Sequence, residues 1–414
     1  MIGSGESVAQ DSTIARGQHL KARPKRIALL TDGLESYGVK RSITTLLKAF
    51  RTYDIEIVYI GFFNGPMAEA AAEVGAEIFI CDFGQAPEFG GFVSTLKNFA
   101  FSFSHARTLA ETIKTARVDC VIVRQPREVP LVAKACWHAK VSGYWLMPNL
   151  ISSKYPFRVN AWIYELVLAG FGMTPIANSA FTQTTLIGKL KKAYHSHLGI
   201  DPAEFSPELY PSADRAQFGF TPDHRIFGIF ARITPEKGQL EFIQGFATAA
   251  RGFPDARLLI CGGPMDSDYG RLIKNAATDL KIADKIYFSG PSDKLGFPIQ
   301  SLYAMCDVIV NSRIDPEPFG LSVIEGMLME KPLLVHASGG PAETVKDNED
   351  GWHVRAGTAA AFGEGVARAL RQQNLWSKYG RNARRHALRD FTHVAAARRI
   401  LSIMQASAAP QSQR

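Results

Sequence analysis

Short apolar runs alternate with stretches of helical spacing along the first half of the chain, starting at Lys25. The strand-like runs are KRIALLTDG, IEIVYIGFF, EIFICDF, DCVIVRQP and PIANSA. Apolar residues recur every three or four positions between them, which predicts helices over residues 39–50, 66–76, 105–116 and 182–194. Strands that alternate with helices predict βαβ units and a parallel sheet.

The alternation stops between Leu198 and His224, a stretch rich in Pro, Asp and Ser without a periodic apolar face. It then restarts with the runs RIFGIFARI, RLLICGG, KIYFSG, DVIVNS and PLLVHASGG. Helices are predicted over residues 239–250, 269–280 and 321–329, and a helical tail over 359–405. The pattern therefore predicts an α/β chain of two doubly wound, Rossmann-like domains in series, with a cleft between the carboxyl ends of two parallel sheets.

These changes in the pattern along the chain divide it into five segments. Residues 1–24 read as a flexible polar arm, 25–197 as the first Rossmann-like domain and 198–224 as a linker. Residues 225–390 form the second Rossmann-like domain, and 391–414 a helix and tail that pack back toward the first domain.

Composition narrows the possible classes of protein. The 414 residues are 46% hydrophobic and 21% charged, which excludes a wholly disordered chain. The net charge of +8 favours anionic partners, leaving nucleic acid, an anionic membrane surface and a phosphorylated small molecule open. Five scattered cysteines without CxxC spacing argue against a disulfide framework or a zinc site.

Targeting signals are not evident in the sequence. The first two dozen residues contain no apolar core of a signal peptide. The stretch from Ala161 to Ala177 is too short and too interrupted to span a bilayer. We therefore expect a cytoplasmic protein, or one held peripherally at the inner face of a membrane.

Two cations follow the strand GIFAR. Arg232 ends this strand, and Lys237 comes after the turn of Thr234-Pro235 and before Gly238. Both side chains can point off the carboxyl end of the sheet, where they would clamp a diphosphate. Solvated loop charges are the alternative interpretation.

The next strand ends in the turn Gly262-Gly263-Pro264, which allows backbone to approach a ligand closely. Asp266 and Asp268 just after it resemble a metal-binding DxD pair. They lie in a polar turn without a third ligand, so we interpret them as an exposed loop entering a helix.

The most informative stretch runs from Asn311 to Gly326. Glu317 precedes a helix that opens near Gly320, and Glu325 lies inside that helix. The helix end carries unpaired N–H donors and suits an anion, and a carboxylate beside it can accept hydrogen bonds from ribose or hexose hydroxyls. The alternative is one acid at a helix start and an unrelated helical glutamate.

The segments ARITPEKG, ICGGP, DPEPFGLSVIEGM and SGGPAETV, in this order and spacing, resemble the donor half of glycosyltransferase family 4. The resemblance implies the GT-B fold and transfer of a sugar from a nucleotide diphosphate with retention at the anomeric carbon. It also implies that no cofactor and no metal take part.

The same resemblance gives roles to residues. Arg232 and Lys237 would hold the diphosphate, and Gly262 and Gly263 would lie against the donor. Backbone at Phe319, Gly320 and Leu321 would add to the diphosphate site. Glu325 would bind the ribose, Glu317 would contact the sugar near the reacting carbon, and the base would lie against residues around Tyr287 to Ser292.

The first domain resembles the family less. Gly33 stands in the place of the first Gly-rich loop but is followed by Leu34 instead of a second glycine. Asn149 replaces a histidine that the family often places near the cleft, so it could bind a hydroxyl but not act as a base. Arg124 ends a strand at the edge expected to meet the acceptor, with a structural ion pair as the alternative.

An aromatic-rich segment from Phe89 to Phe103, with Lys97, suits either a membrane interface or the protein core. It is the basis for predicting peripheral membrane contact.

The sequence predicts a retaining hexosyltransferase that acts on a nucleotide-diphosphate sugar and a glycan or lipid-linked acceptor in cell-surface polysaccharide biosynthesis. A non-catalytic nucleotide-sugar or glycan-binding module is the alternative. A nucleic-acid binder is disfavoured because the cations are dispersed, and a phosphorylase because no lysine setting for pyridoxal phosphate is evident. The base of the donor (UDP, GDP or ADP), its sugar and the acceptor stay open.

Overall fold

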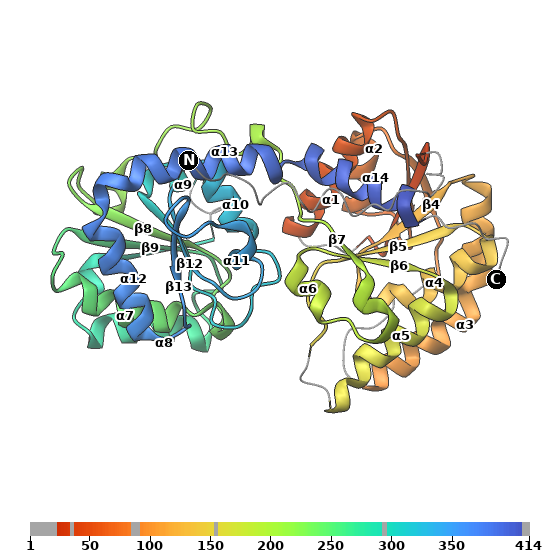
Figure 1. Cartoon of the computed structure of the whole chain (residues 1–414), viewed down its shortest axis with the longest axis horizontal. Helices are drawn as coiled ribbons and strands as arrows, with labels where there is room; N and C mark the ends of the chain where they lie inside the picture. Colours follow the sequence, from red (N-terminus) through yellow and green to blue (C-terminus); the bar gives the residue numbers. More distant parts are fainter. Residues whose placement is uncertain (1–22, 34–36, 84–91, 153–155, 292–295, 408–414) are drawn as a thin grey trace, which may run out of the picture.

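The computed structural model describes residues 23–33, 37–83, 92–152, 156–291 and 296–407. Two α/β domains lie side by side, and the chain returns from the second domain to place its last helix on the first (Figure 1). The predicted polar arm over residues 1–24 falls almost wholly outside the described residues.

The first domain is built on a parallel sheet in which the described strands follow the order β3-β2-β1-β4-β5-β6-β7. The strands are β1 (Arg26–Thr31), β2 (Glu56–Gly61), β3 (Glu77–Ile80), β4 (Cys120–Val123), β5 (Ser142–Met147), β6 (Thr174–Ala177) and β7 (Tyr194–His195). The helices are α1 (Tyr37–Arg51), α2 (Pro66–Glu73), α3 (Phe92–Thr115), α4 (Val129–Ala139), α5 (Val159–Phe171) and α6 (Ala180–Thr184).

The second domain repeats the design with the strand order β10-β9-β8-β11-β12-β13. Its strands are β8 (Arg225–Phe230), β9 (Ala256–Cys261), β10 (Ile286–Gly290), β11 (Val308–Asn311), β12 (Leu333–His336) and β13 (Gly351–Val354). The helices are α7 (Gln239–Ala250), α8 (Asp268–Asp279), α9 (Ile299–Met305), α10 (Leu321–Leu328), α11 (Pro341–Thr344), α12 (Ala359–Arg371), α13 (Trp376–Asp390) and α14 (His393–Ser407).

Both faces of each sheet are covered, as their nearly continuous apolar strands require. In β1, Ala28 and Leu30 pack against α3 and α4, while Ile27 and Leu29 pack against α1 and α14. The strand order reverses between β1 and β4 and again between β8 and β11. Ligands of doubly wound folds bind beyond the carboxyl ends of the strands at such points.

The predicted helix over residues 182–194 is wrong. The chain forms only the short α6, then a 3₁₀ turn, η3 (Gly188–Lys192), and then enters β7. Gly188 has φ +55°, and the buried Glu165 carboxylate accepts a hydrogen bond from Lys189 N (2.9 Å). The carboxylate of another helix thus accepts from backbone N–H groups that a continuing helix would have paired with its own carbonyl oxygens.

The stretch from Leu198 to His224 is packed on the second domain despite its irregular pattern. Ile200, Phe205, Phe218 and Phe220 are buried in the core on the α9 and α10 side of the second sheet. Two 3₁₀ turns, η4 (Pro202–Glu204) and η5 (Arg215–Phe218), carry part of this stretch.

The helical tail is three separate helices, of which α14 packs on the first domain. Ala397, Ile400, Leu401 and Met404 join the core between α14, α1 and the first sheet. The chain crosses between the domains twice, near Ile200 and near Phe391, and the two crossing segments are hydrogen-bonded to each other. Ile200 N donates to Phe391 O (3.0 Å), and His393 N donates to Ile200 O (3.0 Å). Hence the linker and the start of α14 run between the domains as one paired strap.

Candidate functional site

A cavity of about 1000 Å³ opens at the carboxyl ends of β8 and β9. Arg232, Gly262, Gly263 and Glu325 from the second domain line it, and Arg41 from α1 of the first domain completes it. The structure therefore brings four of the predicted donor residues to one place, at the strand reversal where the fold favours a ligand.

Backbone lies open to this cavity because glycine ends β9. Gly262 has φ +155°, and a Cβ there would lie 1.8 Å from the carbonyl oxygen of Ala231. No other residue fits, so the turn after β9 presents backbone instead of side chains to a ligand.

A carboxylate is held between two cations, Lys237 and Arg313, which line a small separate pocket that shares Phe230 and Ala231 with the cavity. Glu317 Oε2 accepts a hydrogen bond from Lys237 Nζ (2.8 Å), and Glu317 Oε1 lies 3.5 Å from Arg313 Nη1. The side chains of all three are less than one-fifth exposed. The two cations fix the direction of the Glu317 carboxylate.

Local backbone explains how Glu317 reaches this position. Glu317 N donates to Ser338 O (3.1 Å), and Gly340 N donates to Glu317 O (2.7 Å). Gly339 has φ +81°, and a Cβ on it would lie 2.2 Å from the carbonyl oxygen of Glu317. The two sequence motifs around Glu317 and Gly339 thus form one paired structure, and the second fixes the first.

The helix α10 begins directly after this loop. Gly320 adopts φ +91° and turns the chain into the helix, while the Phe319 side chain is buried in the core. Ser322 in the first turn lines a small pocket together with Lys237 and Arg313. The first turn of α10 and the cations therefore face the same space.

Glu325 is held by donors from both domains. Tyr303 Oη donates to Glu325 Oε2 (2.6 Å), and Arg41 Nη2 donates to Glu325 Oε1 (3.2 Å). Burial raises the pKa of Tyr303, and the Glu325 carboxylate raises it further, so the phenol stays protonated and donates.

Arg41 also binds the linker. Its Nε donates to Glu204 Oε2 (2.7 Å), and its guanidinium lies 4.8 Å from the centre of the Phe205 ring. Burial opposes its charge, but the carboxylates of Glu325 and Glu204 outweigh burial and raise the pKa of Arg41 above its usual value. A permanent cation from the first domain thus contacts the carboxylate expected to bind the ribose.

The side chain of Arg232 is less constrained than that of Lys237. Its side chain is 74% exposed and lies 3.8 Å from Glu236, a weak pair at the surface. Its carbonyl oxygen accepts from the buried Gln239 side chain (2.8 Å), which fixes the backbone. The backbone of Arg232 is therefore fixed, while its guanidinium is free to move.

A second contact between the domains lies behind the Glu317 loop. Glu343 of α11 accepts from Ala180 N (2.9 Å), Phe181 N (2.7 Å) and His197 Nε2 (3.1 Å). Burial would raise the pKa of Glu343, but these hydrogen bonds outweigh it and lower the pKa. Ser179 Oγ donates to Pro318 O (2.6 Å), so the first domain touches the residue that follows Glu317.

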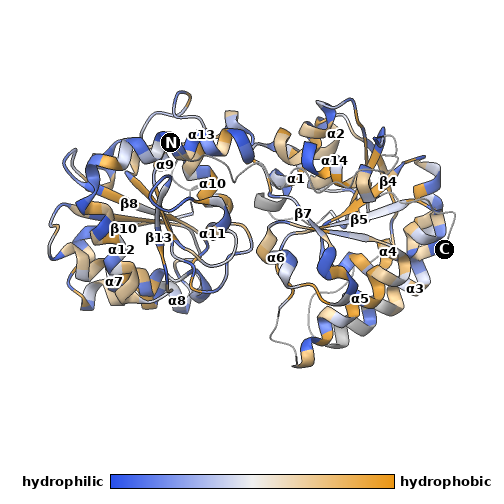
Figure 2. Cartoon of the chain, viewed as in Figure 1, coloured by the Kyte–Doolittle hydropathy of each residue, from blue (hydrophilic) through white to orange (hydrophobic). Residues whose placement is uncertain are grey.

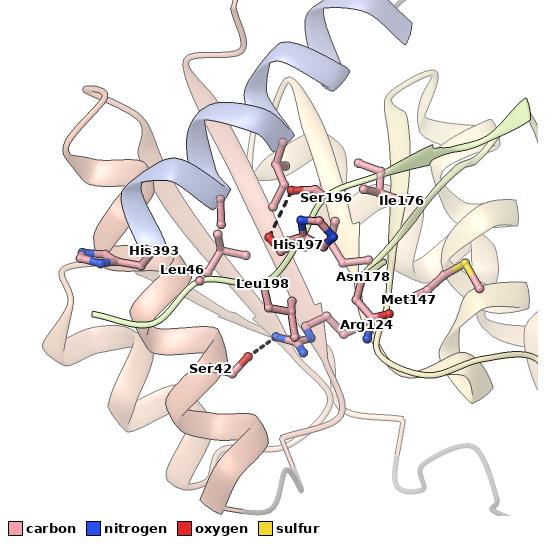
Figure 3. A pocket seen from close by; sticks show the side chains of 14 residues that line it. Ser42, Leu46, Arg124, Met147, Ile176, Asn178, Ser196, His197, Leu198 and His393 are labelled. Atoms are coloured by element: carbon pink, nitrogen blue, oxygen red, sulfur yellow. Dashed lines mark hydrogen bonds between the residues drawn. The ribbon is translucent and has the colours of Figure 1, made fainter. Parts of the chain in front are cut away.

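The predicted acceptor-side residues lie apart from the donor cavity. Arg124 is buried and donates to Ser42 Oγ (2.8 Å) in a cavity at the carboxyl edge of the first sheet (Figure 3). This cavity of about 20 Å³ has room for water only. Asn149 is exposed and Gly33 is buried, with φ +89°. A role for these residues toward an acceptor stays a prediction.

The neighbours of Arg124 form a structural network. Arg127 is ion-paired with the buried Asp32, and Asp32 N donates to Glu128 Oε1 (3.0 Å). These groups fix the turn after β1 to the turn after β4.

Tyr287, in the region expected to hold the base of the donor, packs against the protein core. The Tyr287 ring packs edge-on against Phe218 at 5.0 Å between ring centres, and Ser292 lies outside the described residues. Pro291 and Phe297 line the cavity instead.

The DxD-like pair belongs to a helix start. Ser267 caps α8 by accepting from Gly270 N (3.1 Å), and the exposed Asp268 pairs with Arg271. These contacts agree with the interpretation of Asp266 and Asp268 as a loop that enters a helix.

Four residues of the site escaped the sequence analysis: Arg41, Arg313, Tyr303 and Glu343. Glu343 lies inside the motif SGGPAETV and Arg313 inside the stretch from Asn311 to Gly326, so a charge count of those loops could have found them. Arg41 and Glu325 are 284 positions apart, and Tyr303 lies on a short helix that no periodicity predicts.

The chain is similar to a known family model and to several known proteins. Residues 212–386 match the family model described as "Glycosyl transferases group 1". Two proteins of Bacillus subtilis (strain 168) that bear glycosyltransferase names are similar. EpsD is 28% identical over 46% of this chain, which is 49% of its own length. YtcC is 29% identical over 74% of this chain and 77% of its own length.

Solved structures share the fold over both domains. Anabaena Alr3699/HepE in complex with UDP and glucose matches with a TM-score of 0.71 at 20% identity, covering 91% of this chain and 98% of that chain. A glycosyltransferase from Rickettsia africae ESF-5 matches with a TM-score of 0.73 at 20% identity, covering 93% and 99%. The predicted GT-B fold of two parallel-sheet domains is confirmed. The family model and the names of the relatives support the predicted transferase enzyme, and with it the group 1 family.

Proposed function

We propose that this chain is a retaining glycosyltransferase of family 4. It would move a hexose from a nucleotide-diphosphate sugar to a glycan or lipid-linked acceptor in cell-surface polysaccharide biosynthesis. The observation that carries the proposal is the Glu317 carboxylate oriented between Lys237 and Arg313, two cations that line a pocket adjoining the cavity of Glu325 and Arg232.

Each group has a task in this reaction. Lys237 has three N–H donors, so it can keep one on Glu317 and turn the others to the diphosphate. Arg232 is free to close on the same phosphates. As the diphosphate leaves, positive charge grows at the anomeric carbon, and the Glu317 carboxylate orients the sugar and favours that charge. The acceptor proton would pass to the leaving phosphate.

Glu325 would bind the ribose diol, a part of the donor that does not react. The related HepE structures contain UDP and UDP-glucose, so UDP-sugars are the first donors to test, with GDP- and ADP-sugars beside them. Peripheral membrane contact through Phe89–Phe103 stays a prediction. In the described part of that segment Phe101 is buried in the core and Phe103 is 68% exposed.

The alternative is a binding module of the same fold that does not catalyse transfer. Cations and carboxylates that converge on one cavity serve binding as well as transfer, so turnover decides between the two.

The first prediction separates the two cations. Arg232→Ala and Lys237→Ala should each weaken binding of the preferred nucleoside diphosphate by about 1.5–3 kcal/mol, the contribution of a charge-assisted hydrogen bond. Only Lys237→Ala should also lower the melting temperature, because it leaves Glu317 with one cation in a mostly buried place. Titration calorimetry with UDP, GDP and ADP and thermal unfolding measure both effects.

Lys274→Ala on the exposed face of α8 is the matched control and should change neither quantity. Unchanged affinity in both cleft variants would show that the donor site lies elsewhere.

The second prediction concerns metal. We expect transfer to persist in excess EDTA, because Arg232, Lys237 and the start of α10 supply the positive field that a metal supplies elsewhere. Loss of activity in EDTA with recovery on Mn²⁺ or Mg²⁺ would bring Asp266 and Asp268 back into the site.

A further inference from the structure

The outer face of α5 carries apolar side chains and no charge. Val159, Trp162 and Leu166 are 40%, 54% and 71% exposed and follow one another at helical spacing. The one acidic or basic residue of the helix, Glu165, is buried and accepts from Lys189 N. A surface helix of a water-facing domain normally exposes charge on this side.

Neighbouring segments continue this surface. Phe157, just before α5, is 96% exposed. Trp137 of α4 is 57% exposed, and its ring centre lies 6.2 Å from that of Phe171 at the end of α5. Figure 2 shows apolar colouring along much of α5. We call Trp137, Phe157, Val159, Trp162 and Leu166 the apolar face.

Positive charge lies on a segment that packs against α5. Lys189, Lys191 and Lys192 are exposed on η3, which the Glu165 contact ties to α5. Between residues 129 and 200 the sequence holds seven Lys and Arg residues and one acidic residue, the inward Glu165. This stretch thus accounts for six of the eight excess positive charges of the chain.

The face lies near the side of the domain where an acceptor is expected. The chain leaves the carboxyl end of β5 at Pro148, and α5 begins at Val159. Carboxyl ends of parallel strands share one edge of the sheet, so this segment starts on the same edge as Arg124. The chain that leads to the apolar face therefore starts at the carboxyl edge of the first sheet.

We propose that the apolar face with its lysines docks this protein on an anionic lipid bilayer. Exposed Trp and Leu insert at the level of the headgroups, and the lysines pair with anionic headgroups around them. A second copy of the chain fits this surface less well, because a symmetric contact would bring the lysine clusters of both copies together. The described residues contain no helix both long and apolar enough to cross a membrane, so the contact is peripheral.

The proposal concerns binding to lipid and needs no nucleotide, so it fails or succeeds apart from the proposed function. Flotation of the full-length protein with vesicles tests it. We compare phosphatidylcholine vesicles with vesicles that also contain phosphatidylglycerol, at low and high salt. Wild type should float with the anionic vesicles, and high salt should weaken the binding.

Two variants and their matched controls locate the surface. The double substitution Trp162→Ser and Leu166→Ser should lower binding by about tenfold or more. Replacement of Lys189, Lys191 and Lys192 by Ala should lower binding to anionic vesicles by about a hundredfold. The controls are Leu272→Ser with Leu388→Ser, and Ala at Lys48, Lys274 and Lys378, all exposed elsewhere, and they should bind as wild type.

Circular dichroism and nucleotide binding check that each variant stays folded. Absence of wild-type flotation overturns the proposal, as does equal binding of the variants and their controls. So does sedimentation that shows a lipid-free dimer which Trp162→Ser and Leu166→Ser dissociate, because the face would then join two copies.

Discussion

Glu317→Gln should lower kcat by about two to three orders of magnitude, the usual effect of removing one group that stabilises transition-state charge. The glutamine keeps the shape of the side chain but loses the negative charge that the reacting sugar needs. It also leaves Lys237 and Arg313 without the carboxylate between them, so we expect a lower melting temperature. The donor KM should change much less than kcat, because the sugar hydroxyls can still bind the amide.

Steady-state kinetics with the preferred donor measure this effect. Asp315→Asn is the matched control, since Asp315 is an exposed acid on the same loop. It should leave both constants near those of wild type. A Glu317→Gln enzyme that loses only donor affinity would remove Glu317 from the chemistry and leave it as a binding residue.

Glu325→Gln should act on binding instead, raising the donor KM by about ten- to a hundredfold with little change in kcat. Its proposed partner is the ribose, which would be bound alike in the ground state and the transition state. Arg41→Ala should produce the same kind of effect, because it takes away one of two donors that orient Glu325. Arg41→Lys should restore part of the loss, since a cation returns but the two-pronged contact with Glu325 and Glu204 does not.

A double-mutant cycle between Arg41 and Glu325 tests whether they act together. Residues in contact should show a coupling free energy of about 0.5–3 kcal/mol in donor binding. Tyr303→Phe isolates the other donor and should raise KM while Arg41 stays in place. Additive effects of Arg41→Ala and Glu325→Gln would show that the contact between the domains has no part in donor recognition.

The alternation of apolar runs and helical stretches predicts most of the fold because buried parallel strands and amphipathic helices leave strong local patterns. The predicted helix over 239–250 is observed as α7 over the same residues. The pattern fails where distant groups decide local structure. Glu165 satisfies the backbone of η3 from another helix, and the apolar residues of the linker are buried by α9 and α10.

The convergence of Arg232, Gly262, Gly263 and Glu325 was predictable because these residues lie in short motifs at strand ends. Glu317 and Gly339 even pair by backbone, so two motifs 22 positions apart report one structure. Arg41 was not predictable, because its contact with Glu325 depends on how the two domains meet. In the first domain the sequence did not separate structural residues from ligand-binding residues. Arg124, for example, contacts Ser42 and Trp145, and such contacts are compatible with either role.

The most direct test of the central claim is release of nucleoside diphosphate from the sugar nucleotide whose nucleotide binds best, measured with and without acceptors. The account predicts that a glycan or lipid-linked acceptor stimulates release by wild type and that Glu317→Gln abolishes most of this stimulation. Tight binding of the sugar nucleotide without acceptor-dependent release, across both classes of acceptor, would contradict transfer and identify a binding module.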